Sequence, residues 1–201
     1  TLFISGNVRQ AVSEGRADFT PVRLAEIPML FRSGAVPLDV AMIHVSPPDA
    51  HGFCSYGVEI GVSKAAAETA RLVIAEINPQ MPRTLGDSFI HVSRITACVE
   101  TDRPLPELPQ GDSNPIADQI GQCIADLIPD SATMQLGIGA VPDAVLRCLT
   151  HKRHLVIHSE LFSDGIIDLV EAGVIDGEAK TIHRGKLVAG FLLGTRRLFD
   201  W

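Results

Sequence analysis

Short runs of apolar, mostly β-branched residues recur along this chain, and segments with helical spacing separate them. The runs that predict strands are 40–45, 72–77, 133–136 and 155–158. Apolar runs without polar alternation are typical of parallel strands that are buried on both faces. Between the last two runs, Val141, Val145 and Leu149 recur at helical spacing. Pro142 suits the first turn of that helix. The order predicts a βαβ unit and places the chain in the α/β fold class.

Two other segments begin with signals for a helix. Ser63 precedes the helix-like stretch 64–70. Asn114, followed by Pro115, begins a second helix that extends through Leu127. One stripe of this second helix consists of Ile116, Ile120, Cys123, Ile124 and Leu127. Each helix leads directly into a predicted strand, which supports the α/β alternation.

Composition and charge exclude several classes of protein. The 201 residues are 46% apolar and 20% charged, which excludes disorder for most of the length. Lys and Arg number 17 against 24 Asp and Glu, and the basic residues are scattered, which argues against a nucleic-acid partner. No apolar run approaches the roughly 20 residues of a membrane helix, and the first residues lack the pattern of a leader. We therefore expect a soluble, cytoplasmic protein with no membrane partner.

The cysteines and histidines do not form a metal site in the sequence. Cys54, Cys98, Cys123 and Cys148 lie at least 25 residues apart, which gives neither a CxxC motif nor a Cys/His cluster. Four thiols in a chain of this length do not make a disulfide scaffold. We expect small buried thiols in a reducing compartment, and no metal.

A proline-rich segment divides the chain. Four of the twelve residues 104–115 are proline, and proline neither continues a helix nor donates to a strand ladder. The segment is expected to run extended across a surface between two units. This division predicts a first domain at 1–103, a linker at 104–113 and a second domain at 114–201. The second unit is short for a doubly wound sheet, so we expect the chain to be part of a longer protein.

The predicted strand 133–136 leads into Gly137 and Gly139 before a helix. Such glycines let the backbone approach a ligand, and the N–H groups of the helix N-terminus favour an anion or a developing oxyanion. A lone Gly-x-Gly is also a common tight turn. The next strand ends at Glu160, 23 residues after Gly137, at the sheet edge where ligands bind in open α/β folds. Glu160 should lie beside the glycine loop, either as a solvated residue or as a functional acid.

Spacing alone leaves two functions open for Glu160. In a dinucleotide-binding fold, the glycine loop binds pyrophosphate and an acid about 20 residues later binds a ribose hydroxyl. Pro142 stands at the third glycine position of that fingerprint, which argues against this function. Alternatively, Glu160 is a nucleophile that attacks a thioester, and the loop stabilises the oxyanion. Gln135 would then add an amide donor, or it is simply a strand residue that points away from the core.

Two motifs form a paired signature, at 135–145 and 158–165. Further stretches that agree in the same order are 6–12, 26–28, 45–52, 78–84 and 194–198. Together they resemble the acetyl-CoA hydrolase/transferase family, which includes acetate, butyrate and 4-hydroxybutyrate CoA-transferases. The resemblance covers essentially the whole chain, and a collinear set of motifs is far more specific than any one of them.

The resemblance implies two CoA-transferase-like open α/β domains, both incomplete here. It implies that Glu160 attacks an acyl-CoA to form an anhydride, and that CoA returns to give a glutamyl-CoA thioester. A short-chain carboxylate then reverses the sequence, which makes the transfer ping-pong. The stretch that matches CoA contacts in the family is Gly137, Ile138, Gly139, Ala140 and Val141, and Gln135 matches a side chain near the acyl oxygen. The implied chemistry needs no metal and no cofactor beyond CoA itself.

The loop 46–52 has two interpretations. Its two prolines and its glycine are typical of a turn between strands. The resemblance places the same loop at a domain interface, where it would line the acyl pocket. Pocket shape selects the acyl group, so acetate, propionate, butyrate and 4-hydroxybutyrate all stay open.

Members of this family are roughly twice as long as this chain. Functions other than CoA transfer therefore stay open. Water that reaches the anhydride or thioester would make the protein an acyl-CoA hydrolase. An inactive fragment and a nucleotide-binding oxidoreductase also stay open. A parallel sheet cut between strands exposes an apolar face and an unpaired edge, so we expect a homo-oligomer.

Overall fold

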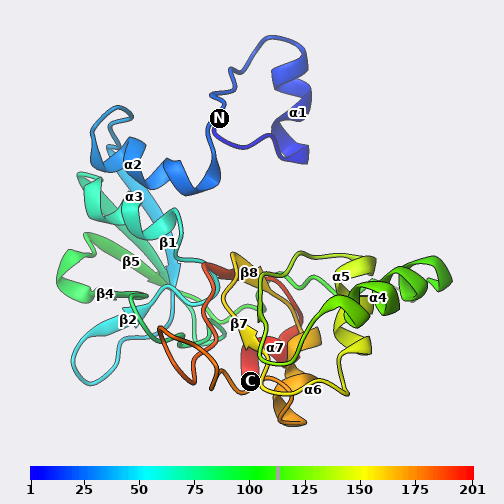
Figure 1. The fold of residues 1–201 in the computed structure, drawn as a ribbon. Coiled ribbons are helices and arrows are strands. Elements are labelled where there is room, and N and C mark those ends of the chain that lie inside the picture. The colour runs from blue at the N-terminus through cyan, green and yellow to red at the C-terminus, as the bar shows by residue number, and fades with distance from the viewer. Residues whose placement is uncertain (112–113) are drawn as a thin grey trace.

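The computed structural model describes residues 1–111 and 114–201, and it confirms the α/β class (Figure 1). The helices are α1 Gly6–Ser13, α2 Ile27–Arg32, α3 Ser63–Thr69, α4 Pro115–Leu127, α5 Ala140–Cys148, α6 Gly165–Glu171 and α7 Arg196–Asp200, with 3-10 turns at Leu24–Glu26 and Val92–Arg94. The strands are β1 Val40–Val45, β2 Phe53–Ser55, β3 Leu72–Ile77, β4 Phe89–His91, β5 Ala97–Glu100, β6 Thr133–Met134, β7 Val156–Ile157, β8 Leu161–Phe162 and β9 Phe191–Leu192. In Figure 1, α1 stands apart from the rest of the molecule.

A parallel sheet in the order β1-β3-β5 organises the first part of the chain. Val40 pairs with Leu72 and Val45 with Ile77, so β1 and β3 match over their full lengths. Both strands have the bounds that the apolar runs at 40–45 and 72–77 predict. β2 and β4 form a separate antiparallel pair.

The two faces of this sheet differ in burial. On one face, Ala67 of α3 joins a core that includes Val45, Val73 and Ala75. The opposite face carries Val40, Met42, Leu72 and Ile74, each at least 39% exposed. We call these four residues the open sheet face. In the described residues, helical cover is therefore present on one side of this sheet only. Burial on both faces is predicted for the two strands of the βαβ unit, where both residues of β7 are buried but Thr133 of β6 is exposed.

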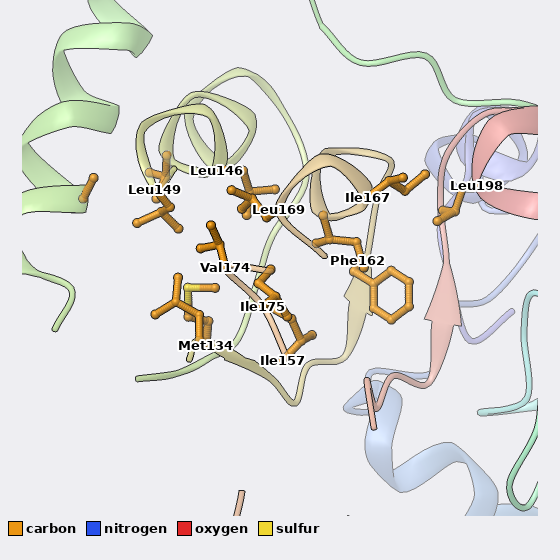
Figure 2. Packing of buried hydrophobic residues seen from close by; sticks show 14 of the residues in the cluster. Met134, Leu146, Leu149, Ile157, Phe162, Ile167, Leu169, Val174, Ile175 and Leu198 are labelled. Atoms are coloured by element: carbon orange, nitrogen blue, oxygen red, sulfur yellow. The ribbon is translucent and has the colours of Figure 1, made fainter. Parts of the chain in front are cut away.

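The larger hydrophobic core lies where α5, α6 and α7 pack around β6, β7 and β8 (Figure 2). β6 and β7 are parallel, with Thr133 opposite Val156 and Met134 opposite Ile157. Since α5 connects these two strands, the predicted βαβ unit is confirmed. The side chains that are almost completely buried in this core are Leu149, Leu155, Ile157, Ile166, Ile167 and Ile175.

β6 and β7 are shorter than the apolar runs predict. Regular pairing covers two residues in each strand, whereas the runs extend over 133–136 and 155–158. The flanking residues form single bridges to other segments: Leu136 to Leu161, Leu155 to Ile175 and His158 to Val188. Each strand therefore leaves its partner early, because its ends pair with segments that are distant in the sequence.

Of the two helix caps predicted from the sequence, the structure has one, at the start of α4. The side-chain oxygen of Asn114 accepts from the N–H of Ile116 at 2.9 Å, which confirms the predicted cap of α4. The predicted cap of α3 is wrong, because Ser63 lies within the helix. There the carboxylate of Glu59 accepts from the N–H of Val62 at 2.9 Å and from the Ser63 hydroxyl.

Helix α4 packs on α5 through its smallest residues. Ala117, Gly121 and Ala125 are buried, and a Cβ on Gly121 would lie 2.8 Å from a backbone atom of Ala144. The stripe predicted from the sequence is instead exposed on the other side: Ile116, Ile120, Cys123, Ile124 and Leu127. Small side chains let the two helix axes approach closely, so they determine which side of α4 is buried.

The cysteines are less buried than the sequence predicts. Cys54 is buried and Cys148 is half-buried, but Cys98 and Cys123 are exposed. Cys98 lies on β5, whose four residues are all exposed, and Cys123 lies on the outward stripe of α4. Their exposure therefore follows from the elements that carry them.

The described part of the linker, 104–111, contains neither helix nor strand. It does not simply cross a surface, because Leu105 is buried in the larger core. The N–H of Leu108 also donates to the carbonyl of Gly194 at 2.8 Å. The predicted linker ends at 113, and its last two residues lie outside the described part of the chain.

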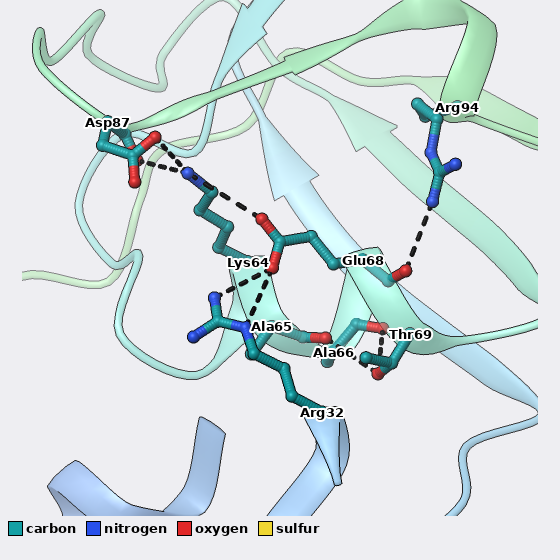
Figure 3. A network of polar contacts seen from close by, with 8 residues as sticks. All are labelled: Arg32, Lys64, Ala65, Ala66, Glu68, Thr69, Asp87 and Arg94. Carbon is teal, nitrogen blue, oxygen red and sulfur yellow. Dashed lines mark hydrogen bonds and ion pairs between the residues drawn. The ribbon is translucent and has the colours of Figure 1, made fainter. Parts of the chain in front are cut away.

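Charged side chains connect α2, α3 and the segments on both sides of β4 (Figure 3). The guanidinium of Arg32 lies 2.8 Å from Glu68 Oε2, and Lys64 contacts the carboxylate of Asp87. Arg94 donates to the Glu68 carbonyl at 3.3 Å. Most of these side chains are exposed, and exposed ion pairs stabilise a fold by about 1 kcal/mol or less. Figure 3 therefore shows a solvated surface network rather than a site.

Candidate functional site

The parallel pairing of β6 and β7 brings the glycine loop 137–139 and Glu160 to the same sheet edge. Both segments follow the carboxyl ends of their strands, because the two strands run in the same direction. The prediction that Glu160 lies beside the loop requires β6 and β7 to be parallel neighbours, and the structure shows that they are.

Ser159 joins the two segments directly. Its side-chain oxygen accepts from the N–H of Leu136 at 2.9 Å and donates to the Leu136 carbonyl at 3.3 Å. Ser159 is 8% exposed, so both hydrogen bonds are shielded from water. The residue before Glu160 is therefore fixed to the residue before Gly137. Sequence reasoning did not identify this contact, because its only signal is a small polar residue at the end of a strand.

The backbone of Glu160 is held from a third segment. Its carbonyl accepts from the N–H of Gly190 at 2.8 Å and from the N–H of Phe191 at 3.2 Å. The side chain is exposed, and within residues 1–111 and 114–201 its carboxylate has no hydrogen bond or ion pair. The site therefore combines a fixed backbone with a free carboxylate.

The glycine loop turns the chain into α5. Gly139 has φ +110° and precedes the helix, and its position has open space around it. That conformation is reached almost only by glycine. α5 begins at Ala140, two residues before Pro142, because Gly139 already turns the chain. The first N–H groups of a helix have no partner within it, so they are available to an anionic group.

The predicted loop contacts differ in exposure. Gln135, Gly137, Ile138 and Gly139 are exposed, whereas Ala140 and Val141 are half-buried at the start of α5. Gln135 immediately follows β6, and Leu136 separates it from Gly137. The loop and Gln135 therefore offer an open surface beside Glu160 rather than an enclosed cavity.

Two buried carboxylates support the elements around this edge. Asp143 is 4% exposed, and the Ser163 hydroxyl lies 3.5 Å from its carboxylate. Burial raises the pKa of Asp143. Asp164 accepts from the Thr195 N–H at 2.8 Å and from the Thr195 hydroxyl at 2.5 Å. Asp164 therefore ties the start of α6 to the start of α7.

A cavity of about 490 Å³ lies next to this region but outside it. Its apolar lining includes Met42, Tyr56, Leu105, Leu192 and Phe199. Glu160, Gln135 and the glycine loop lie outside the cavity. The cavity wall and the Glu160 turn share one segment, since residues 58–60 pair with residues 190–192.

One polar atom at this cavity is unsatisfied. His44 lines the cavity, and its Nε2 is buried without a hydrogen-bond partner in the described chain. Glu76 Oε1 lies 3.9 Å away. Burial lowers the pKa of His44, which favours the neutral imidazole. A hydrogen bond from Arg103 lowers the pKa of Glu76 to about 2, so this carboxylate is ionised near neutral pH.

The loop 46–52 lies outside the cavity and forms a turn. The Asp49 carboxylate accepts from the N–H groups of His51 and Phe53, each at 2.9 Å. Gly52 has φ +82°. Of the two interpretations from the sequence, the turn therefore agrees with the structure.

The described residues contain no group of three or more His, Cys, Asp or Glu side chains arranged to hold a metal ion. None of the helices in the described part of the chain has the length and apolar character needed to cross a membrane.

Comparison with known proteins finds relatives that are named CoA transferases. The protein is 54% identical to the 4-hydroxybutyrate coenzyme A transferase of Clostridium kluyveri over all of this chain and 47% of that protein. It is 47% identical to a succinyl-CoA:acetate/propanoyl-CoA:succinate CoA transferase of Fasciola hepatica, again over all of this chain and 42% of that protein.

Solved structures have the same fold. A 4-hydroxybutyrate CoA-transferase from Porphyromonas gingivalis matches with a TM-score of 0.85 and 42% identity, covering 100% of this chain and 52% of that one. RipA from Yersinia pestis matches with a TM-score of 0.91 and 34% identity, covering 99% and 48%. The chain thus spans about half the length of the relatives it matches.

The family model of the acetyl-CoA hydrolase/transferase N-terminal domain matches residues 1–109, which is more than half of the chain. The same range contains the parallel β1-β3-β5 sheet, and the relatives match on through Glu160 to the end of the chain. On these grounds, the chain belongs to the acetyl-CoA hydrolase/transferase family.

Proposed function

We propose that this protein is a CoA-transferase that moves CoA between a short-chain acyl-CoA and a carboxylate, with Glu160 as the nucleophile. The observation that carries the proposal is the free Glu160 carboxylate on a backbone fixed beside the glycine loop. Covalent catalysis needs a nucleophile that is held in place but is not occupied by another partner. Glu160 meets both conditions.

The names of the relatives support this reaction class. Besides those above, they include a butyryl-CoA:acetate CoA-transferase of Anaerostipes caccae, which is 35% identical. The curated relatives cited here are all named CoA transferases, and the names of those from Fasciola hepatica and Anaerostipes caccae give both an acyl-CoA donor and a carboxylate acceptor. The substrates proposed for this protein are therefore an acyl-CoA and a short-chain carboxylate, with CoA as substrate and no metal or further cofactor.

The proposed chemistry begins at the thioester carbonyl. A carboxylate oxygen of Glu160 attacks this carbon and the C–S bond breaks, which gives an acyl-glutamyl anhydride and CoA thiolate. The thiolate then attacks the glutamyl carbonyl and releases the first acyl group as a carboxylate. The product is a glutamyl-CoA thioester, and a second carboxylate reverses both steps.

The glycine loop and Gln135 are proposed to assist at this carbon. The N–H groups at the start of α5 and the amide of Gln135 can donate to the oxyanion or to CoA, because both lie at the sheet edge that carries Glu160. Gly137, Ile138, Gly139, Ala140 and Val141 are the proposed CoA contacts.

We also propose that the chain divides into two domains, one at 1–103 and one at 114–201.

Hydrolysis is the alternative function. Glu160 is exposed in this chain, and an anhydride or thioester at an exposed position is open to attack by water. Acyl-CoA consumption without an acceptor carboxylate would identify the hydrolase. A nucleotide-binding oxidoreductase would instead bind a nicotinamide cofactor, and Glu160→Gln would weaken that binding.

The intact mass of the protein tests the proposal. The protein is incubated with acetyl-CoA and acetate, and Glu160→Gln and Glu100→Gln are treated in the same way. Glu100 is an exposed carboxylate on β5, so it controls for the loss of a negative charge. We expect a CoA-sized adduct on the parent and on Glu100→Gln, and none on Glu160→Gln. An adduct on Glu160→Gln, or none on the folded parent, contradicts the proposal for this chain.

A further inference from the structure

Lys180 is a buried cation close to the strand that carries Glu160. The residue is 8% exposed and lies in the segment between α6 and β9. Its Nζ donates to the Ile157 carbonyl at 3.0 Å and to the Lys186 carbonyl at 2.9 Å. No carboxylate forms an ion pair with it in residues 1–111 and 114–201. Burial lowers the pKa of Lys180.

A buried ammonium without a counter-ion is costly, and an apolar side chain would pack in its place without that cost. The two carbonyls that it binds belong to different segments. Ile157 is the last residue of β7, three residues before Glu160. Lys186 begins the stretch that returns to the site as residues 186–191. The contact of Lys180 therefore joins the two segments that meet at Glu160.

The hydrogen bonds beyond this contact run in order toward the candidate nucleophile. The N–H of Val188 donates to the Ile157 carbonyl at 3.4 Å, and the N–H of Ser159 donates to the Val188 carbonyl at 2.9 Å. Gly190 and Phe191 then donate to the Glu160 carbonyl. Lys180 thus lies at the start of a short ladder, and Glu160 lies at its end.

We propose that Lys180 is a positioning residue, whose ammonium holds β7 and residues 186–191 in the register that fixes the backbone of Glu160. This role rests on the proposed function, because it concerns the placement of the Glu160 carboxylate against an acyl-CoA. A displacement of about 1 Å at a reacting group can reduce a rate by about 100-fold. The effect is therefore expected on the rate of chemistry and not on binding of CoA.

The test compares Lys180→Met with Lys186→Met. Methionine has a similar length to lysine but no donor, so the first variant removes both hydrogen bonds. The Lys186 side chain is exposed, and its substitution removes a cation nearby while its backbone carbonyl remains. Lys180→Leu, which also lacks a donor, takes its place if Lys180→Met does not melt cooperatively, and the same results are expected of it.

Hydrogen exchange is measured first, because it does not require activity. We expect Lys180→Met to accelerate exchange at the N–H groups of Ser159, Gly190 and Phe191 by about tenfold or more, as expected for the loss of hydrogen bonds to a charged group. Exchange in β1 and β3 should not change. Unchanged exchange at the three N–H groups would overturn the proposed contact.

The rate of CoA adduct formation on Glu160 is measured next. For Lys180→Met we expect a loss of about 10- to 100-fold in the maximal rate, with a KM for acyl-CoA within about threefold of the parent. Lys186→Met should match the parent. Equal losses in both variants, or a loss confined to KM, would overturn the positioning role. If the parent forms no adduct, the proposed function fails for this chain, and the exchange measurement alone decides whether Lys180 fixes Glu160.

Discussion

The hydroxyl of Ser159 makes two hydrogen bonds with the backbone of Leu136, accepting from its N–H at 2.9 Å and donating to its carbonyl at 3.3 Å. A side chain at the end of one strand thus replaces the ladder that β6 and β7 would make if they continued. The contact sets the distance between the glycine loop and Glu160. It also explains how a pair of two-residue strands presents a defined edge.

Removal of this hydroxyl should destabilise the fold. In Ser159→Ala, the N–H and carbonyl of Leu136 lose their partner in a shielded position, which costs about 1–3 kcal/mol. Urea denaturation measures the change in the free energy of unfolding. Ser13→Ala is the control, since the Ser13 hydroxyl bonds the Gln10 carbonyl at an exposed position. Equal effects of the two substitutions would contradict the structural role of Ser159.

The two loop glycines should respond differently to alanine. Gly139→Ala forces a side chain into φ +110°, and we expect a loss of about 1–3 kcal/mol in the free energy of unfolding. A Cβ on Gly137 would lie 3.5 Å from Pro142, an ordinary contact, so Gly137→Ala should change stability by less than about 1 kcal/mol. Thermal and urea unfolding compare the two. A larger loss in Gly137→Ala would refute this explanation.

Asp143 predicts a pH dependence of stability. Burial raises its pKa above the ordinary value of 3.8, so the folded protein retains this proton at pH values where the unfolded chain has lost it. The free energy of unfolding therefore falls as the pH rises from below 3.8 through the raised pKa of the folded state. Asp143→Asn cannot ionise and should lose less stability over that range.

Urea denaturation at several pH values between about 4 and 7 measures the difference between the parent and Asp143→Asn. The variant should gain on the parent as the pH rises. Asp126→Asn removes an exposed carboxylate on α4 and is the control for net charge. A constant difference across the pH range would show that Asp143 does not contribute through ionisation.

The open sheet face predicts self-association. Val40, Met42, Leu72 and Ile74 form an exposed apolar patch on a parallel sheet, and Met42 is 82% exposed. Contiguous apolar patches favour association. We expect a dimer or larger species by light scattering, and Met42→Glu should shift it toward monomer. Met29→Glu, at an exposed position on α2, should have no such effect. A parent that is monomeric at all concentrations would disprove this prediction.

The sequence predicts those parts of the fold that depend on local pattern. β1 and β3 have the predicted bounds, because an apolar run of six residues matches one complete pairing in each strand. The position of Glu160 beside the glycine loop also follows from the sequence, since consecutive strands joined by one helix are usually neighbours in the sheet. The chemistry assigned to Glu160 stays a prediction.

Contacts between distant residues could not be predicted. The stripe that contains Ile116 is apolar, but α4 is buried on the side of Gly121, where close approach to Ala144 decides the packing. Ser159 and Lys180 act on carbonyls or N–H groups 23 residues away, and hydrogen bonds of this kind leave no periodic signal in a sequence. The buried side of α4 and these hydrogen bonds therefore depend on tertiary packing, which the local sequence pattern does not show.

The N–H groups of Gly190 and Phe191 fix the backbone of Glu160 through its carbonyl. The position of this residue therefore does not depend on its side chain. Any L-residue at this position can accept the same two backbone hydrogen bonds. The side chain at position 160 can thus be exchanged for another reactive group while the backbone hydrogen bonds remain. Cysteine or serine could be placed there with little effect on folding, which makes this turn a starting point for installing other acyl-transfer chemistry on the same scaffold.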